Sequence, residues 1–276
     1  MHEAYPGRVI DVGIAEAEAV ASAAGMAYQG AHPVVALYAT FLNRGFDQLL
    51  MDVALHRAGV TVVLDRAGVT GADGASHNGV WDIAMCSMIP GLRLAAPRDE
   101  QTLRARLREA LDVDDAPTVI RYRKGSLPEP MPALRSVGGV DILFDEAVAD
   151  SPARVLIVGT GACAPDAIEA ARRLAAAGVS VTVADPQWMI PICPELATLV
   201  RDYDCVVSVE DGIVQGGFGW SLRDAVAETG VPVRCLGVPQ GFPEHGERAA
   251  MIAQFGFDAD GIERAARELV ERIGER

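Results

Sequence analysis

Lysine is almost absent from this sequence, because Lys124 is the only one in 276 residues and the other long cationic side chains are all arginine. We interpret this bias, together with the many alanines, as the mark of a GC-rich genome. The formal net charge is −14, and basic residues form few runs. Such a surface is a poor partner for nucleic acid, since neutralising phosphates requires clustered Lys and Arg. An anionic substrate would need a local cationic pocket in an acidic protein.

Long apolar runs and paired cysteines are also missing. No run of 18 or more apolar residues occurs, which argues against a membrane span. The first residues lack the basic and apolar stretches of a secretory signal. The five cysteines are scattered without a CxxC pair, which indicates reduced thiols rather than a metal cluster or a disulfide framework. These absences predict a cytoplasmic protein without a membrane partner.

Half of the residues are hydrophobic, and they alternate between short β-branched runs and longer stretches with helical spacing. The predicted strands are 34–38, 60–64, 92–95, 118–122, 155–158, 181–184, 205–209 and 233–236. The predicted helices are 41–58, 99–111, 164–177, 194–201, 219–228 and 260–273. This alternation predicts an α/β fold with parallel or mixed sheets covered by helices, and the length suits about two domains.

The domain boundary is predicted in the middle of the chain. Residues 125–139 hold three prolines and two adjacent glycines without periodicity, which is typical of a linker. We therefore predict a first domain at 1–127, a linker at 128–142 and a second domain at 143–276. Residues 8–12 look like a strand that feeds a loop. A complete parallel domain would usually carry another strand and helix earlier, so the first domain is expected to be incomplete at its N-terminal side.

Glu16 is the first candidate functional residue. It follows a glycine and opens an alanine-rich helix that runs to about Gly30. One interpretation is an acidic residue placed in a first helical turn by the helix dipole, as for Glu18. The other is a buried carboxylate at a strand end, where α/β proteins bind ligands.

Two further blocks combine aromatic, cationic and polar residues. In the stretch 38–47, Phe41 and Arg44 are three residues apart and share a helix face. One interpretation is a core residue and a surface residue. The other is an aromatic platform with an anion-binding arginine. The loop 65–79 follows an apolar strand and contains four glycines, Asp73 and His77. Loops carry function more often than regular elements, and histidine transfers protons near neutral pH. The run 121–125 ends a strand with cations and is either a solvated charge run or a phosphate anchor.

Together these blocks resemble the 1-deoxy-D-xylulose-5-phosphate synthase family, within the transketolase-like thiamine-diphosphate enzymes. The matching stretches run along essentially the whole chain: DVGIAE, ALYATFLNRGFDQLLMDVALHR, VLDRAGVTGADGASHNG, PGLRLAAPRD, DDAPTVIRYRKG and LGVPQGFPEHGER. Several blocks in the right order are more specific than any single motif. The resemblance implies a transketolase pyrimidine-binding domain followed by a transketolase C-terminal domain.

The resemblance also implies roles for individual residues. Glu16 matches the catalytic glutamate that contacts N1′ of the aminopyrimidine of thiamine diphosphate, and the cofactor supplies the electron sink. Phe41 matches the ring that stacks on the aminopyrimidine, with Tyr38 beside it. The remaining matches concern the substrate: cations near the acceptor phosphate (Arg44, Arg66 and Lys124) and polar residues that position the acceptor and move protons (Asp73 and the catalytic His77). The implied reaction joins pyruvate to glyceraldehyde 3-phosphate with loss of CO₂.

Two departures from the family pattern bear on this interpretation. The family usually has E-Q-H after DVGIA, whereas this chain has Glu16-Ala17-Glu18. The family's diphosphate-binding domain, with its GDG and asparagine motif for Mg²⁺, has no counterpart in the sequence. We therefore expect thiamine diphosphate and Mg²⁺ to require a diphosphate-binding domain or subunit from another chain segment, within a homo- or hetero-oligomer.

Two alternatives stay open at this stage. The chain could be the small subunit of a split transketolase or of a 2-oxoacid dehydrogenase first component. It could also be a non-catalytic assembly module, which the Glu16-Ala17-Glu18 change favours. The retained Phe41, Arg44, Asp73 and His77 argue against a module of that kind, because a scaffold has no need of such a set.

Overall fold

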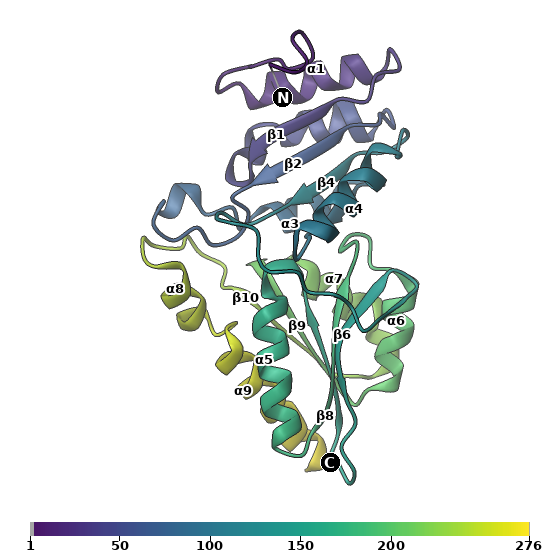
Figure 1. The fold of residues 1–276 in the computed structure, drawn as a ribbon, viewed down its shortest axis with the longest axis vertical. Coiled ribbons are helices and arrows are strands. Elements are labelled where there is room, and N and C mark those ends of the chain that lie inside the picture. Colours follow the sequence, from purple (N-terminus) through teal and green to yellow (C-terminus); the bar gives the residue numbers. More distant parts are fainter. Residues whose placement is uncertain (1–2, 276) are drawn as a thin grey trace.

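The computed structural model describes residues 3–275 and divides into two lobes, each with one sheet (Figure 1). The helices are α1 (Glu16–Ala27), α2 (Phe46–Gln48), α3 (Asp82–Ser87), α4 (Glu100–Leu111), α5 (Ala164–Ala176), α6 (Pro194–Leu199), α7 (Phe218–Ala225), α8 (Arg248–Phe255) and α9 (Ala259–Gly274). The strands are β1 (Val34–Tyr38), β2 (Thr61–Asp65), β3 (Arg93–Ala95), β4 (Thr118–Arg121), β5 (Arg135–Val137), β6 (Val140–Glu146), β7 (Arg154–Gly159), β8 (Ser180–Pro186), β9 (Cys205–Ile213) and β10 (Val233–Val238). The predicted α/β fold class is confirmed.

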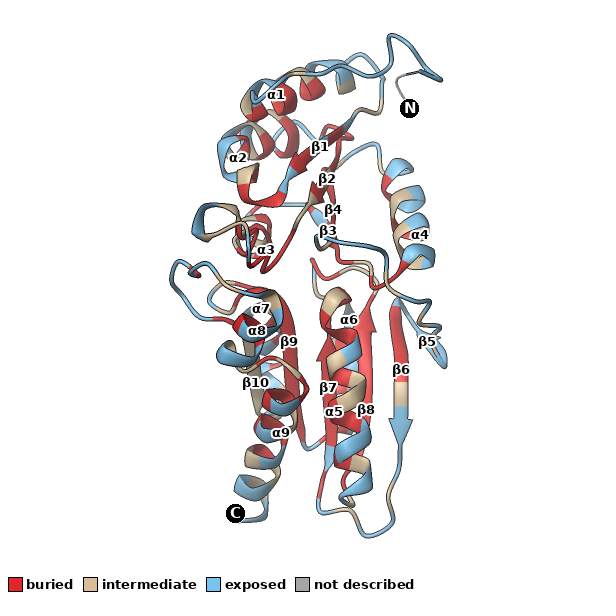
Figure 2. Cartoon of the chain, turned by 60° about the vertical axis from the view of Figure 1, so that its left-hand side comes forward, coloured by how far each residue is buried: buried red, intermediate tan, exposed pale blue. Residues whose placement is uncertain are grey.

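The first sheet has the order β1-β2-β4-β3, and all of its pairings are parallel. Helix α1 and the residues after β1 cover one face, while α4 covers the other (Figure 2). Parallel strands place their carboxyl ends along one edge, and ligands of α/β proteins bind beyond that edge. The segments after β1 and β2, which carry most of the predicted site residues, both begin there.

The second sheet has the order β10-β9-β7-β8-β6-β5, with β6 antiparallel to β8 and β5 antiparallel to β6. Alternate residues of its strands face different cores, as the two-residue period of a strand requires. On β7, Val155 and Ile157 belong to the core beneath α5 and α9. Leu156 and Val158 belong to the core that continues into the first lobe. The two lobes therefore share one hydrophobic core.

Three details differ from the sequence predictions. Residues 8–12 do not form a strand, because no neighbouring strand completes a ladder with them, and all but the half-buried Val12 are exposed. The segment predicted as linker contains β5 and the start of β6, joined at Gly138 and Gly139 with φ of 52° and 88°. Adjacent glycines with positive φ are the signal of a two-residue hairpin turn. The predicted helix at 41–58 is divided into a 3-10 helix (Ala39–Arg44), α2 and a π-helix (Leu49–Ala54).

Gly45 explains the break in that helix. Its backbone leaves the helical region, with φ −110° and ψ 11°. A Cβ on Gly45 would stand 3.0 Å from a methyl carbon of Val20 and 3.3 Å from the carbonyl oxygen of Glu16. The missing side chain thus lets the first turn of α1 approach the segment after β1, which brings Glu16 to Arg44.

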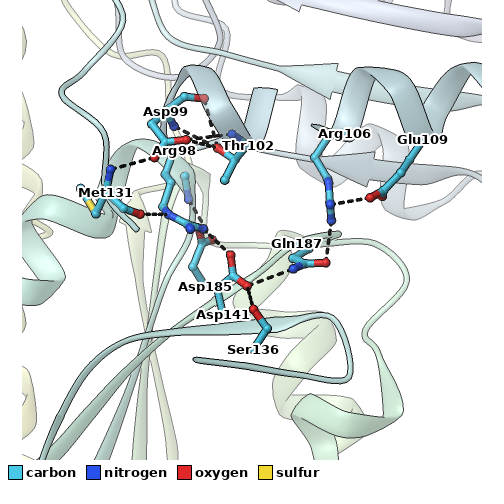
Figure 3. A network of polar contacts seen from close by, with 11 residues as sticks. Arg98, Asp99, Thr102, Arg106, Glu109, Met131, Ser136, Asp141, Asp185 and Gln187 are labelled. Atoms are coloured by element: carbon cyan, nitrogen blue, oxygen red, sulfur yellow. Dashed lines mark hydrogen bonds and ion pairs between the residues drawn. The ribbon is translucent and has the colours of Figure 1, made fainter. Parts of the chain in front are cut away.

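Buried ion pairs also join the lobes (Figure 3). Arg98, between β3 and α4, lies only 3.0 Å or less from carboxylates of Asp141 on β6 and Asp185 on β8. Its Nε donates to the carbonyl of Met131 at 2.9 Å. The main chain of β3 meets the second lobe as well, because the Met189 N–H donates to the Leu94 carbonyl at 2.7 Å. The first lobe is therefore anchored by polar contacts in addition to shared apolar packing.

Glu210 on β9 gives the second lobe a predicted pH dependence. Its carboxylate accepts hydrogen bonds from the N–H groups of Phe218 and Gly219 at 2.8 and 2.9 Å. Burial raises the pKa of Glu210 from 4.5 to about 7. The unfolded chain thus loses this proton at lower pH than the folded chain, so folding loses stability as pH rises from about 4.5 to about 7.

We expect Glu210→Gln to reduce this loss by roughly 2–3 kcal/mol between pH 5 and pH 8, at about 1.4 kcal/mol per pKa unit. Urea unfolding at both pH values measures it, with the exposed Glu228→Gln as the matched control. An unchanged pH dependence in Glu210→Gln, equal to that of the control, would contradict the role given to Glu210.

No helix within residues 3–275 has the length and apolar character needed to cross a membrane.

Candidate active site

Glu16 lies in the first turn of α1 and is buried, with 8% of the residue exposed. An acidic residue is favoured there by the helix dipole. Its Oε2 lies 3.4 Å from Nη1 of Arg44, whose side chain is 55% exposed. Among residues 3–275, this is the one hydrogen bond to the Glu16 carboxylate, so Oε1 remains free to accept another. The structure therefore presents a buried carboxylate with an accessible, movable cation beside it.

An aromatic group adjoins this carboxylate. Tyr38 ends β1 and Phe41 lies in the 3-10 helix that follows, with ring centroids 6.0 Å apart and planes at 19°. The guanidinium of Arg44 lies 4.6 Å from the centre of the Phe41 ring. The ring of His77 meets Phe41 edge-on at 5.4 Å. Phe41 is thus a half-buried platform between the carboxylate–arginine pair and the loop histidine.

The loop after β2 and the residues after β4 supply the remaining charged side chains. Arg66 lies 4.2 Å from the centre of the Tyr38 ring, and its Nη1 is 3.7 Å from Asp73 Oδ2. Lys124, after β4, contacts Asp73 Oδ1 at 2.6 Å. The hydrogen bond from Lys124 holds the pKa of Asp73 below its usual value, with a smaller contribution from the charge of Arg66. Asp73 therefore remains ionised and holds two cations together.

The structure brings all eight predicted site residues into one connected set. Glu16 contacts Arg44, and Arg44 contacts Phe41. Phe41 contacts both His77 and Tyr38. Tyr38 contacts Arg66, and Arg66 and Lys124 both pair with Asp73. The sequence alone did not predict the pairing of Arg44 with Glu16, because the two residues are 28 positions apart along the chain. Two carboxylates, a flat aromatic face, a histidine and three cations suit a heterocyclic cofactor next to an anionic substrate.

Two residues that hold this arrangement were missed by the sequence analysis. Asn78 is fully buried, and its Oδ1 accepts from the N–H of Thr70 at 2.8 Å while its Nδ2 donates to Gly74 O at 3.0 Å. Thr40 donates its hydroxyl to the Ser76 carbonyl at 2.9 Å, which ties the loop to the segment that carries Phe41. The glycines around Asn78 were the only sequence feature that could have indicated a tight turn held by this side chain.

Arg121 is a structural residue rather than a phosphate anchor. It is buried, and its Nε donates to Asp82 at the start of α3 at 2.7 Å. Of the cations in the run 121–125, Lys124 is the one that joins the predicted site. The departure from the family pattern at Glu18 falls on an exposed side chain, away from the buried side of α1. No cluster of metal-ligating side chains occurs within residues 3–275.

Comparisons with known proteins find matches for both domains of the chain. The family model of the transketolase pyrimidine binding domain matches residues 1–130, and that of the transketolase C-terminal domain matches residues 147–262. A 1-deoxy-D-xylulose-5-phosphate synthase of Corynebacterium glutamicum (strain R) is 52% identical over 94% of this chain and 42% of its own length. The 1-deoxy-D-xylulose-5-phosphate synthase 2 of Kitasatospora griseola is also 52% identical, over 97% of this chain and 43% of its own.

A solved structure described as a split gene transketolase, an inactive beta4 tetramer, matches with a TM-score of 0.83 and 29% identity, over 98% of this chain and 86% of the other. The chain spans about two fifths of the length of the curated relatives that it matches. Both domain matches and the identity along nearly the whole chain show that it belongs to the 1-deoxy-D-xylulose-5-phosphate synthase family of transketolase-like proteins, of which it contains the pyrimidine-binding and C-terminal domains.

Proposed function

We propose that this chain forms the pyrimidine-binding part of a thiamine-diphosphate site that condenses pyruvate with glyceraldehyde 3-phosphate, with loss of CO₂. A diphosphate-binding domain on another chain segment would complete the site and hold Mg²⁺. The observation that carries this proposal is the buried carboxylate of Glu16 close to the Phe41 platform. Arg44 connects the two, because it pairs with Glu16 and its guanidinium lies over the Phe41 ring.

The residues around Glu16 fit an aminopyrimidine. A buried carboxylate accepts a hydrogen bond from a ring nitrogen most strongly where water is excluded, and Glu16 has an acceptor atom to spare. Arg44 is half exposed and its contact with Glu16 is long, at 3.4 Å, so a ring nitrogen can replace it as the partner of the carboxylate. Phe41 would stack on the ring. Bound thiamine diphosphate would supply the electron sink for the decarboxylation of pyruvate.

The loop after β2 fits a phosphorylated acceptor. Arg66 and Lys124 are now held by Asp73, and a phosphate group would give these two cations a second anionic partner. His77 contacts the Ser76 hydroxyl through Nδ1 at 2.8 Å, which orients its ring. No other residue among 3–275 hydrogen-bonds Nε2, so that nitrogen is available to exchange a proton with the substrate.

Reconstitution tests this function. We expect the purified chain alone to give no measurable synthase activity, because nothing in it is assigned to the diphosphate. Mixing it with a diphosphate-binding polypeptide of the same family should produce pyruvate consumption that depends on glyceraldehyde 3-phosphate. Robust turnover by the chain without any partner would contradict the proposal, and so would a stable complex that never consumes pyruvate.

The split transketolase is the alternative that a specific observation favours, namely the similarity to the split gene structure over 98% of this chain. Both functions use the same Glu16 and Phe41 arrangement and differ in the donor. The reconstituted complex should therefore be offered pyruvate and, separately, a ketose phosphate. Preference for the ketose phosphate would establish the alternative.

A further inference from the structure

Hydrogen bonds from the second lobe hold the loop at residues 66–79 in place near its start. The Val69 N–H donates to Oδ1 of Asp211 on β9 at 2.9 Å, and the Val69 carbonyl accepts from Nε of Arg248 at 3.0 Å. Arg248 at the start of α8 and Asp211 are themselves paired at 2.7 Å. Two side chains of one domain thus satisfy both backbone polar groups of a single residue, Val69, in the other domain.

This contact leaves little freedom to the loop. A side chain on Gly68 would collide with the Asp211 carboxylate, and one on Gly71 would collide with the backbone of Gly246 and Arg248. Both glycines also have positive φ, of 80° and 73°. The close approach therefore depends on glycine at position 68, directly before Val69, and at position 71, two residues after it.

The far end of the loop is held by the same network. Asp82 follows the loop at the start of α3 and is paired with Arg121, whose Nη2 donates to the Asp211 carbonyl at 2.8 Å. Asp82 and Asp211 are 0% and 1% exposed, so these contacts are made without competition from water. Asp73 and His77 lie between the two fastened ends.

The geometry points to Asp211 and Arg248 as positioning residues for the acceptor subsite, through which the C-terminal domain sets the placement of Asp73 and His77. This inference rests on the proposed function. The second lobe would then contribute to substrate recognition by keeping the site residues in position. A displacement of about 1 Å at a site residue costs as much as 10²-fold in rate.

The test uses Arg248→Ala and Arg248→Lys. The lysine variant keeps the charge next to buried Asp211 but cannot reach both Asp211 and the Val69 carbonyl, since it lacks the guanidinium fork. In the assembled enzyme, each variant should raise the KM for glyceraldehyde 3-phosphate by about 10-fold or more and leave the KM for pyruvate within about 2-fold. A merely structural role would lower the active fraction without separating the two KM values. Arg267→Ala, which removes an exposed pair with Glu263, is the matched control.

Hydrogen–deuterium exchange of the full chain supplies a readout that needs no activity. Residues 66–79 should exchange faster in both variants, while β7 and β9 keep their protection. Unchanged exchange in the loop, or equal changes in both KM values, would overturn the inference. If the wild-type complex lacks synthase activity, the proposed function fails, and the exchange data still decide whether Arg248 fastens the loop.

Discussion

Glu16→Gln is expected to lower the turnover of the assembled enzyme by about 10²-fold or more, which is the low end for loss of a positioned proton-transfer group. The substitution keeps the shape of the side chain but removes the charged acceptor that we assign to the aminopyrimidine. Stability should change little, because the one ion pair lost is a long contact, at 3.4 Å, with the half-exposed side chain of Arg44, and glutamine can still accept a hydrogen bond there. Steady-state rates at saturating cofactor measure the effect, and Glu16→Ala should behave in the same way.

Glu18→Gln is the matched control for this prediction. It makes the same chemical change on the same helix, two residues further on and on the exposed side. The control should retain nearly normal turnover. Near-normal turnover in Glu16→Gln would remove Glu16 from the mechanism, whereas a similar loss in both variants would mean that the helix, and not one carboxylate, is responsible.

Arg98→Ala is expected to lower the free energy of unfolding by about 3–5 kcal/mol, the usual cost of removing one partner of a buried ion pair. The side chain of Arg98 is 5% exposed and neutralises both Asp141 and Asp185. Burial already raises the pKa of Asp185 to about 7. Without Arg98 this pKa should rise further, so the loss of stability should be larger at pH 8 than at pH 5.

Urea unfolding measures this effect, and Arg104→Ala on the same stretch of chain is its control. Arg104 pairs with Glu100 on the surface of α4, with side chains 75% and 53% exposed, so its removal should cost less than about 1 kcal/mol. Adding Asp185→Asn to Arg98→Ala should recover part of the stability, since it removes one uncompensated charge. Equal losses of unfolding free energy in the Arg98 and Arg104 variants would show that the buried ion pairs of Arg98 do not stabilise the contact between the lobes.

Local periodicity was sufficient to predict most regular elements of this fold. The parallel strands of both sheets and the long helices α4, α5 and α9 were predicted from their sequence patterns, and the structure confirms them. The break at Gly45 was not predictable from its neighbours, because its cause is the approach of α1 from elsewhere in the chain. The hairpin of β5 and β6 had a local signal in Gly138 and Gly139, which was interpreted as a linker.

The candidate site shows the same division between local and distant information. Family motifs identified eight residues, and the structure places them in contact, although their chemical roles remain predictions. The contact of Val69 with Asp211 joins residues 142 positions apart, and no local pattern indicates such a pairing. Arg121 was grouped with Lys124 by sequence, yet Arg121 is the last residue of β4 and pairs with Asp82, whereas Lys124 lies beyond the strand and pairs with Asp73.

The central claim is that the buried carboxylate of α1 serves a heterocycle whose diphosphate is held by a different chain segment. A crystal structure of the assembled complex with thiamine diphosphate tests it most directly. We predict that Glu16 will have exchanged Arg44 for a ring nitrogen at hydrogen-bond distance, roughly 2.6–3.2 Å, with Phe41 against the ring. Cofactor density elsewhere, with the Glu16–Arg44 pair still intact, would contradict the account.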